Sequence, residues 1–246
     1  EIVTRAIDAT IAQATARPES PLGKALTVAV GYASDAGFDE LLMRMIAERK
    51  WLSQASRIEE GRHDDPFTGV ERLLRRHFRV RQGMTRSAVE EERAQLFDDD
   101  TLRALRDHLA GGSKSDVTSS RSLANALTTH NAKERAKAVC DYLLTASETA
   151  RDRLMTNGLA GSRPDLLALA QRAQTQMLAL TSELKAITVV EATLALYRLA
   201  DRVLQFYEEA KAAAAALDFD DLIERTISLL STSQSADWVL FKLDGG

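Results

Sequence analysis

The sequence is poor in residues that interrupt helices and in residues that form cross-links. Its 246 residues include 12 glycines, 4 prolines and a single cysteine, and aromatic residues make up 5% of the chain. The scarcity of helix breakers, beside many alanines, leucines and arginines, predicts an all-α protein. One cysteine excludes an internal disulfide. Cys140 lies in AVCDYLL at helical spacing, which predicts a small buried thiol rather than a nucleophile or a metal ligand.

The sequence also lacks a strong excess of either charge and any long apolar run. The formal net charge is −4, so a nucleic-acid contact would have to come from a local basic patch. No apolar run approaches the length needed to span a bilayer, and no signal peptide precedes the first helical pattern. We therefore expect a cytoplasmic protein with no membrane partner.

The motifs of the common catalytic sites are missing. There is no GxxxxGK[ST] phosphate loop, no GxSxG elbow and no HExxH. The four histidines, at 63, 77, 108 and 130, have no metal-ligand spacing with one another or with Cys140. Acidic triplets occur at 90–92 and 98–100, but consecutive carboxylates on a helix point in different directions. We predict no catalytic residue, metal site or cofactor site in these residues.

Turn residues divide the chain into helical segments. Residues 1–54 predict three helices, and 67–80 predict a basic helix after a polar loop. The segment 111–116, GGSKSD, predicts a flexible joint. From these signals we expect three parts: an N-terminal helical subdomain over 1–110, a helical arm over 111–216, and a further helix over 217–246.

The longest segment without glycine or proline predicts one long helix near 165–214. Apolar residues recur along it at steps of three and four, which is the pattern of a coiled-coil-like seam. We interpret this seam as core packing rather than as a ligand site. Its members are Leu166, Ala170, Ala173, Met177, Leu180, Leu184, Ile187, Val190, Leu194 and Tyr197.

A new helix is predicted to begin after residue 217. Asp218 can cap it, and Asp221 completes a pattern resembling a capping box. The helix is expected to cover 219–230. A helical pattern is already under way at Glu1, and an apolar run lies just before Gly246, so we expect the chain to be part of a longer protein.

The C-terminal third resembles a known family. YRLADRVLQFYEEAKAAAAALDFDDLIERTISLL, followed by WVLFKLDGG, resembles the stretch ahead of the Walker B motif in UvrD-like superfamily-1 DNA helicases. The similarity is closest to the AddA-type subunit of bacterial helicase–nucleases that process double-strand DNA ends. DYLLTASETARDRLMTNGLAGSRPDLLALAQ and GGSKSD resemble the same subunit's accessory region.

The resemblance implies an accessory domain, similar to helicase domain 1B, inserted in the first of two motor domains. The parent protein would be an ATP-dependent DNA helicase, with or without exonuclease activity, that acts in double-strand-break repair and recombination. Its Walker A lysine would precede Glu1 and its Walker B carboxylates would follow Gly246. ATP, Mg²⁺ and a second helicase–nuclease subunit would therefore be partners of the parent. This part would contact or position duplex DNA. Asp218, Phe219 and Asp221, which match the family's LDFDDLI-type phrase, would cap and anchor the helix that returns to the motor.

The strongest local charge is a basic run between residues 70 and 87. Five of its arginines are candidate DNA contacts, and Leu73, Leu74 and either Phe78 or Val70 are expected to face inward. The candidates are Arg72, Arg75, Arg76, Arg79 and Arg81. One alternative stays open, in which these arginines pair with the acidic stretch EEERAQLFDDD in an intramolecular network. A second hypothesis for the whole chain is a freestanding helical scaffold or adaptor that binds a protein partner.

Overall fold

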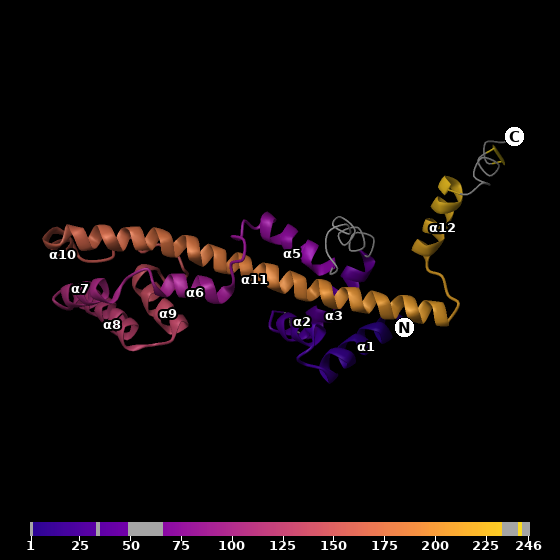
Figure 1. The fold of residues 1–246 in the computed structure, drawn as a ribbon, viewed down its shortest axis with the longest axis horizontal. Coiled ribbons are helices and arrows are strands. Elements are labelled where there is room, and N and C mark those ends of the chain that lie inside the picture. Colours follow the sequence, from indigo (N-terminus) through magenta and orange to yellow (C-terminus); the bar gives the residue numbers. More distant parts are fainter. Residues whose placement is uncertain (1, 33–34, 49–65, 233–240, 243–246) are drawn as a thin grey trace. The chain divides into compact units, whose positions relative to one another are not determined.

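The computed structural model describes residues 2–32, 35–48, 66–232 and 241–242 (Figure 1). These residues form eleven helices and no β-strand, apart from one isolated antiparallel bridge between Leu144 and Ala150. The predicted all-α class is confirmed. Within the same residues, no helix combines the length and the apolar character needed to cross a membrane.

Helix α11 (Pro164–Ala213) has 50 residues and is the longest element. Its first residue is a proline, which is tolerated there because the first amide of a helix has no intrahelical acceptor. At about 1.5 Å per residue it runs about 75 Å. Eight of the ten predicted seam residues are buried and Leu184 and Leu194 are partly buried, so the interpretation as core packing is confirmed.

The chain forms two compact units, and α11 contributes to both. Unit 1 comprises residues 1–55 and 195–246, and unit 2 comprises residues 56–194. The predicted ranges 1–110, 111–216 and 217–246 do not coincide with these units. Helix α11 is uninterrupted and contributes apolar residues to the cores of both units. One boundary between the units therefore falls within α11 and not at a glycine-rich turn.

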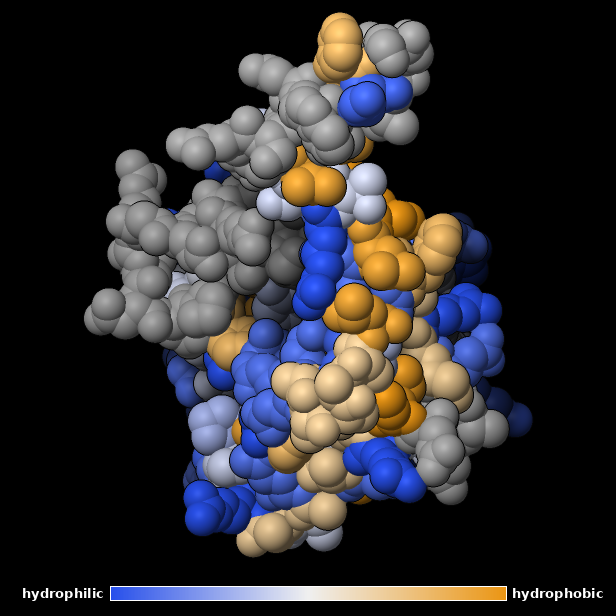
Figure 2. Space-filling model, turned by 90° about the vertical axis from the view of Figure 1, so that its right-hand side faces the viewer, coloured by the Kyte–Doolittle hydropathy of each residue, from blue (hydrophilic) through white to orange (hydrophobic). Residues whose placement is uncertain are grey.

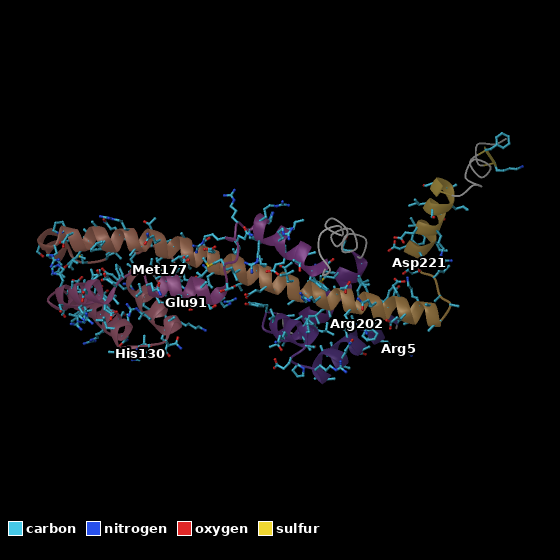
Figure 3. All side chains as sticks on the ribbon, in the orientation of Figure 1. Arg5, Glu91, His130, Met177, Arg202 and Asp221 are labelled. Atoms are coloured by element: carbon cyan, nitrogen blue, oxygen red, sulfur yellow. The ribbon has the colours of Figure 1, made fainter. Side chains whose placement is uncertain are left out.

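Unit 2 is built on the first part of α11. Helices α6 (Arg86–Ala94), α7 (Asp99–Ala110), α8 (Lys114–Thr128), α9 (Ala132–Leu143) and the short α10 (Asn157–Ser162) accompany it (Figure 1). The largest core gathers Leu105 of α7, Leu123 of α8, Tyr142 of α9 and Met177 of α11, all fully buried. Met177 lies on α11 beside α6 (Figure 3), where its sulfur accepts a hydrogen bond of 3.3 Å from Nε of the buried Arg93.

The predicted joint at 111–116 is a short turn between α7 and α8, and its last three residues already belong to α8. Ser113 caps α8 and forms a reciprocal capping box with Asp116, whose carboxylate is buried and also accepts the amide of Thr156 at 3.1 Å. These hydrogen bonds lower the pKa of Asp116 despite the opposing effect of burial. A side chain on Gly112 would lie 2.5 Å from Asp116 Oδ2 and 2.6 Å from Leu159. The turn therefore fixes α7 against α8 rather than separating them.

Unit 1 is built on the last part of α11. Helices α1 (Ile2–Ala16), α2 (Pro21–Val30) and α3 (Asp35–Ala47) enclose a core that includes Ile7, Leu42 and, from α11, Leu199 and Val203. The three helices predicted for residues 1–54 are thus present. Helix α12 (Phe219–Thr232) follows α11, and it begins where the sequence predicts and ends two residues later.

Gly112→Ala is expected to destabilise unit 2 by about 1–3 kcal/mol, because the added methyl group meets a carboxylate that is held in place by several hydrogen bonds. Urea unfolding followed by circular dichroism measures this. Gly111→Ala is the matched control: its methyl group would lie 3.9 Å from the nearest atom, the His108 carbonyl oxygen, and should leave stability almost unchanged. Equal midpoints for the two variants would contradict the tight-turn interpretation.

Candidate nucleic-acid interface

The basic run begins on helix α5 (Pro66–His77), which belongs to unit 2. Val70 is buried and Leu73 and Leu74 are half-buried, so this face of the helix turns inward. Arg72 and Arg76, one turn apart, are exposed. Of the two residues considered for the inward face, Val70 occupies it, whereas Phe78 is 37% exposed. The helix thus has an apolar side and a basic side.

The end of α5 presents Arg79 in an uncommon backbone conformation. Its φ is 55°, in the left-handed region that glycine usually occupies. The amide of Val80 donates to the carbonyl oxygen of Arg75 at 2.9 Å, and Val80 itself is buried. This is the Schellman pattern of a helix end, and it fixes the direction in which the chain leaves α5. Arg79 therefore sits at a defined corner, with its side chain exposed.

Three arginines of the basic run are held by partners within unit 2. Arg75 donates to Glu71 at 2.7 Å and to the carbonyl oxygen of Met84 at 2.8 Å. Arg86 donates to Thr188 and Glu191 of α11, at 2.8 and 2.9 Å. Arg81 donates to Glu183 and to Glu92. These contacts secure the connection between α5 and α6, so the role that they support for Arg75 and Arg81 is structural.

Arg81 is the most strongly bonded member of this group. Its backbone amide and its Nε both donate to Glu183, and its terminal nitrogens reach Glu92 at distances down to 2.7 Å. The side-chain hydrogen bond from Arg81 lowers the pKa of Glu183, so the pair stays ionised at neutral pH. The same residues line an open cavity of about 500 Å³ together with Gln95 and Gln176. One cation faces two carboxylates there, which makes the cavity unsuitable for a phosphate.

Two arginines of the run remain available at the surface. Among the residues that the structure describes, Arg76 and Arg79 form no ion pair and both are exposed. Arg72 is exposed on the same side of α5, four residues before Arg76. Nitrogen-tipped side chains stand out from α5 in Figure 3. The structure therefore divides four of the five candidate residues into an outer pair, Arg76 and Arg79, and an inner pair, Arg75 and Arg81, while Arg72 is exposed beside the outer pair.

The alternative of an intramolecular network with the acidic stretch accounts for one pair in the described residues, Arg81 with Glu92. The other acids have different tasks. Asp98 accepts the amide of Thr101 at 2.7 Å and caps α7, and these hydrogen bonds lower its pKa. Asp99 pairs with Arg135 of α9 at 2.8 Å. In the described residues, Arg76 and Arg79 thus form no ion pair with this stretch.

The second candidate region is the junction of α11 and α12 in unit 1. The amide of Asp221 donates to Asp218 and the amide of Asp218 donates to Asp221, each at 2.9 Å. The capping box predicted from the sequence is therefore present. Ala215, with a φ of 49°, follows the end of α11, and the amide of Ala216 donates to the carbonyl oxygen of Lys211 at 3.0 Å.

Lys211 joins the two helices at this junction. Its side chain is 5% exposed, and its ammonium group lies 3.0 Å from Glu208, 3.2 Å from Asp218 and 2.8 Å from Asp221. Burial lowers the pKa of Lys211, but the hydrogen bonds to the carboxylates outweigh it and raise the pKa overall. The bond from Lys211 in turn lowers the pKa of Asp221. The hydroxyl group of Tyr207 donates to Asp218 at 2.8 Å, so that carboxylate is held from two sides.

Phe219 does not share in this network. It is 76% exposed, and further along α12 Leu222 and Ile227 are 50% and 57% exposed. The apolar residues follow helical spacing and form a stripe on one side of α12. Figure 2, viewed from the side on which α12 lies in Figure 1, shows apolar surface (orange) among charged residues (blue). Asp218 and Asp221 therefore serve the helix start, and Phe219 begins an apolar surface.

His63, one of the four histidines, lies outside the described residues. Cys140 is half-buried, and burial raises the pKa of its thiol, which makes it a poor nucleophile. Across the described part of the chain, no three His, Cys, Asp or Glu residues are grouped to hold a metal ion. Comparisons of the chain with models of protein families, with curated proteins and with solved structures found no match.

Two residues of these regions were not anticipated from the sequence. Lys211 looks like an ordinary solvated lysine in EEAKAAAA, and the only signal is its position seven residues before Asp218. Phe78 is one of the two alternatives, with Val70, for the inward face of the basic helix, and its side chain is exposed. The surroundings of Lys211 and of Phe78 depend on how the chain turns after α11 and after α5. The spacing of apolar residues in the sequence does not reveal these turns.

Lys211→Met is expected to loosen the start of α12, because the carboxylates of Asp218 and Asp221 lose their shared cation. We expect a loss of about 1–3 kcal/mol, less than for a fully buried pair because both carboxylates are partly exposed. Hydrogen exchange of the amides at 219–223 should quicken by about tenfold or more. Lys185→Met, which removes an exposed lysine paired with Glu148, is the control. Unchanged exchange in Lys211→Met would show that the backbone caps suffice.

The same junction has a defined dependence on pH. The pKa of Asp221 is lowered in the folded chain, so its contribution to stability is present above the ordinary aspartate pKa of about 4 and is lost as the pH falls through the lowered value. The protection factors of the amides at 219–223, which correct for the intrinsic pH dependence of exchange, should therefore fall on acidification more steeply in the wild type than in Asp221→Asn. Parallel pH profiles for the two proteins would contradict this assignment.

Proposed function

We propose that this chain is a DNA-positioning part of an ATP-dependent superfamily-1 helicase of the AddA type, acting in double-strand-break repair and recombination. The observation that carries the proposal is the division of the basic run that begins on α5. Arg75, Arg81 and Arg86 are bonded within unit 2, whereas Arg76 and Arg79 are exposed, with Arg72 on the same side. The resemblance of residues 197–246 to the helicase family supports the same role.

A rigid helix with guanidinium groups on one side suits a phosphate backbone. Guanidinium groups bond to phosphate oxygens in a planar, forked geometry, and such contacts position a protein on DNA without reading its sequence. A translocating enzyme needs contacts of this kind, because they must form equally at every step. The net charge of −4 does not oppose such binding, since fields from distant surface charges are screened beyond about 8–10 Å at physiological salt.

In the parent enzyme ATP and Mg²⁺ would be bound by motor segments other than these, and a second helicase–nuclease subunit would be the protein partner. The junction at Lys211 fixes the first turn of α12 relative to the end of α11. The apolar stripe on α12, beginning at Phe219, supports packing of this helix against the motor domain. Asp218 and Asp221 are thus assigned to positioning that helix and not to DNA.

The alternative, a freestanding scaffold or adaptor, accounts for the same exposed stripe on α12. The exposed stripe on α12 is an apolar face of the kind that binds a groove on another protein. A chain that is folded and binds no DNA at low salt would leave this alternative as the better account.

Arg76→Ala/Arg79→Ala is expected to weaken binding of a duplex oligonucleotide by about tenfold or more at low salt, because two phosphate contacts are lost. The slope of log affinity against log salt should fall by about 2, since each contact contributes about 0.9. Fluorescence anisotropy over a salt series measures both quantities.

Arg121→Ala/Arg172→Ala is the matched control, because it removes two exposed arginines of unit 2 outside the basic run. It should retain the wild-type affinity. Equal losses in the two double variants would reduce the effect to overall charge and would remove α5 as the interface. Binding by the wild type that does not depend on salt would also contradict the proposal.

A further inference from the structure

The end of α5 carries an exposed aromatic pair between the two outer arginines. His77 and Phe78 lie in sequence between Arg76 and Arg79, and all four side chains reach the surface. The rings of His77 and Phe78 meet edge to face, with centroids 4.9 Å apart and planes at 89°. This geometry is favourable for aromatic rings, and it restricts the orientation of Phe78 even though the side chain is 37% exposed.

The backbone also holds this corner in place. The Schellman bond from Val80 to Arg75 closes the last turn of α5, and Arg75 is itself bonded to Glu71 and Met84. Val80 is buried in the smaller core of unit 2. Phe78 and Arg79 are therefore displayed from a fixed turn. A fixed ring next to a cation lowers the entropy lost when a flat ligand group stacks on it.

Contacts between arginines and phosphates do not involve the exposed aromatic ring of Phe78. In a duplex the faces of the bases are covered by their neighbours, so only the backbone and the groove edges can be reached. In a single strand each base offers a free face, and proteins that bind single strands combine a basic track with aromatic residues on which bases stack. The Arg76–Arg79 segment has both elements within four residues.

We propose that this segment binds single-stranded DNA in preference to duplex, with a base stacked on Phe78 and the adjoining phosphates on Arg76 and Arg79. The inference rests on the proposed DNA-binding function and specifies its ligand. His77 holds the Phe78 ring from one edge and is a positioning residue. The recognition is independent of sequence, because every base has a face that can stack.

The test compares three fluorescent ligands of equal length: a thymidine single strand, a duplex, and an abasic single strand that keeps the phosphates and lacks the bases. Anisotropy titrations use the full chain. The wild type is expected to bind the thymidine strand about tenfold more tightly than the abasic strand, which is the effect expected for one stacked base. Phe78→Leu, which removes the ring and keeps an apolar side chain, should bind the two strands equally. Phe78→Tyr, which retains the ring, should behave as the wild type.

The outcomes separate the two levels of the proposal. Loss of the thymidine preference in Phe78→Leu, with duplex affinity and helical content unchanged, supports the inference. Equal binding of thymidine and abasic strands by the wild type overturns it while leaving the Arg76 and Arg79 duplex contact intact. Absence of all DNA binding overturns the proposed function as well. His77→Ala should reduce the preference for the thymidine strand by a smaller factor than Phe78→Leu, and a larger effect would contradict its positioning role.

Discussion

The continuous apolar seam of α11 is the constraint on which the rest of the structure depends. In the described residues the shorter helices have 6 to 15 residues and are marginal alone in water, so those that contribute to the three cores rely on an apolar partner. Residues from Leu166 to Met177 supply that partner in one core, Leu180 to Val190 in a second, and Ala195 to Tyr207 in the third. Because each core depends on a different stretch of one helix, a helix breaker is excluded along its whole length. The absence of glycine and proline from 165 to 211 is thus explained by packing.

The polar side of α11 has a separate task. Glu183 and Glu191, eight residues apart, face the connection between α5 and α6 and bind Arg81 and Arg86. An arginine that is held in this way contributes little to the attraction of a polyanion, because its charge is compensated nearby. It does make the neighbouring segment rigid. In the proposed function the two groups of arginines therefore have complementary roles. The inner arginines stabilise the connection between α5 and α6, and the outer arginines contact the ligand from this stabilised connection.

Features set by neighbouring residues could be predicted from the sequence, and features set by distant ones could not. The seam and the Asp218–Asp221 capping box follow from spacings of three and four residues, and both are present. The division of the arginines depends on Glu183, which is 102 residues from Arg81, and no periodicity reveals that pairing. The GGSKSD turn was expected to be flexible because its composition is typical of linkers. Its rigidity comes from the buried Asp116 carboxylate and its bond to Thr156, forty residues away. The composition of a segment indicates how flexible it is in the unfolded chain. It does not indicate which contacts the segment makes after folding.

The two candidate surfaces differ in the kind of ligand that their chemistry can accept. The outer side of α5 has cations and an aromatic ring. Helix α12 has an apolar stripe, and at its start the buried ammonium group of Lys211 binds three carboxylates, those of Glu208, Asp218 and Asp221. Acidic groups at Asp218, Asp221 and Glu208 repel a phosphate backbone, and the apolar stripe gains nothing from one. The α12 surface is therefore suited to a protein and the α5 surface to a nucleic acid. In the proposed function, a part of a helicase that holds DNA while it stays attached to the motor would need both surfaces, and their different chemistry would keep them from competing for the same ligand.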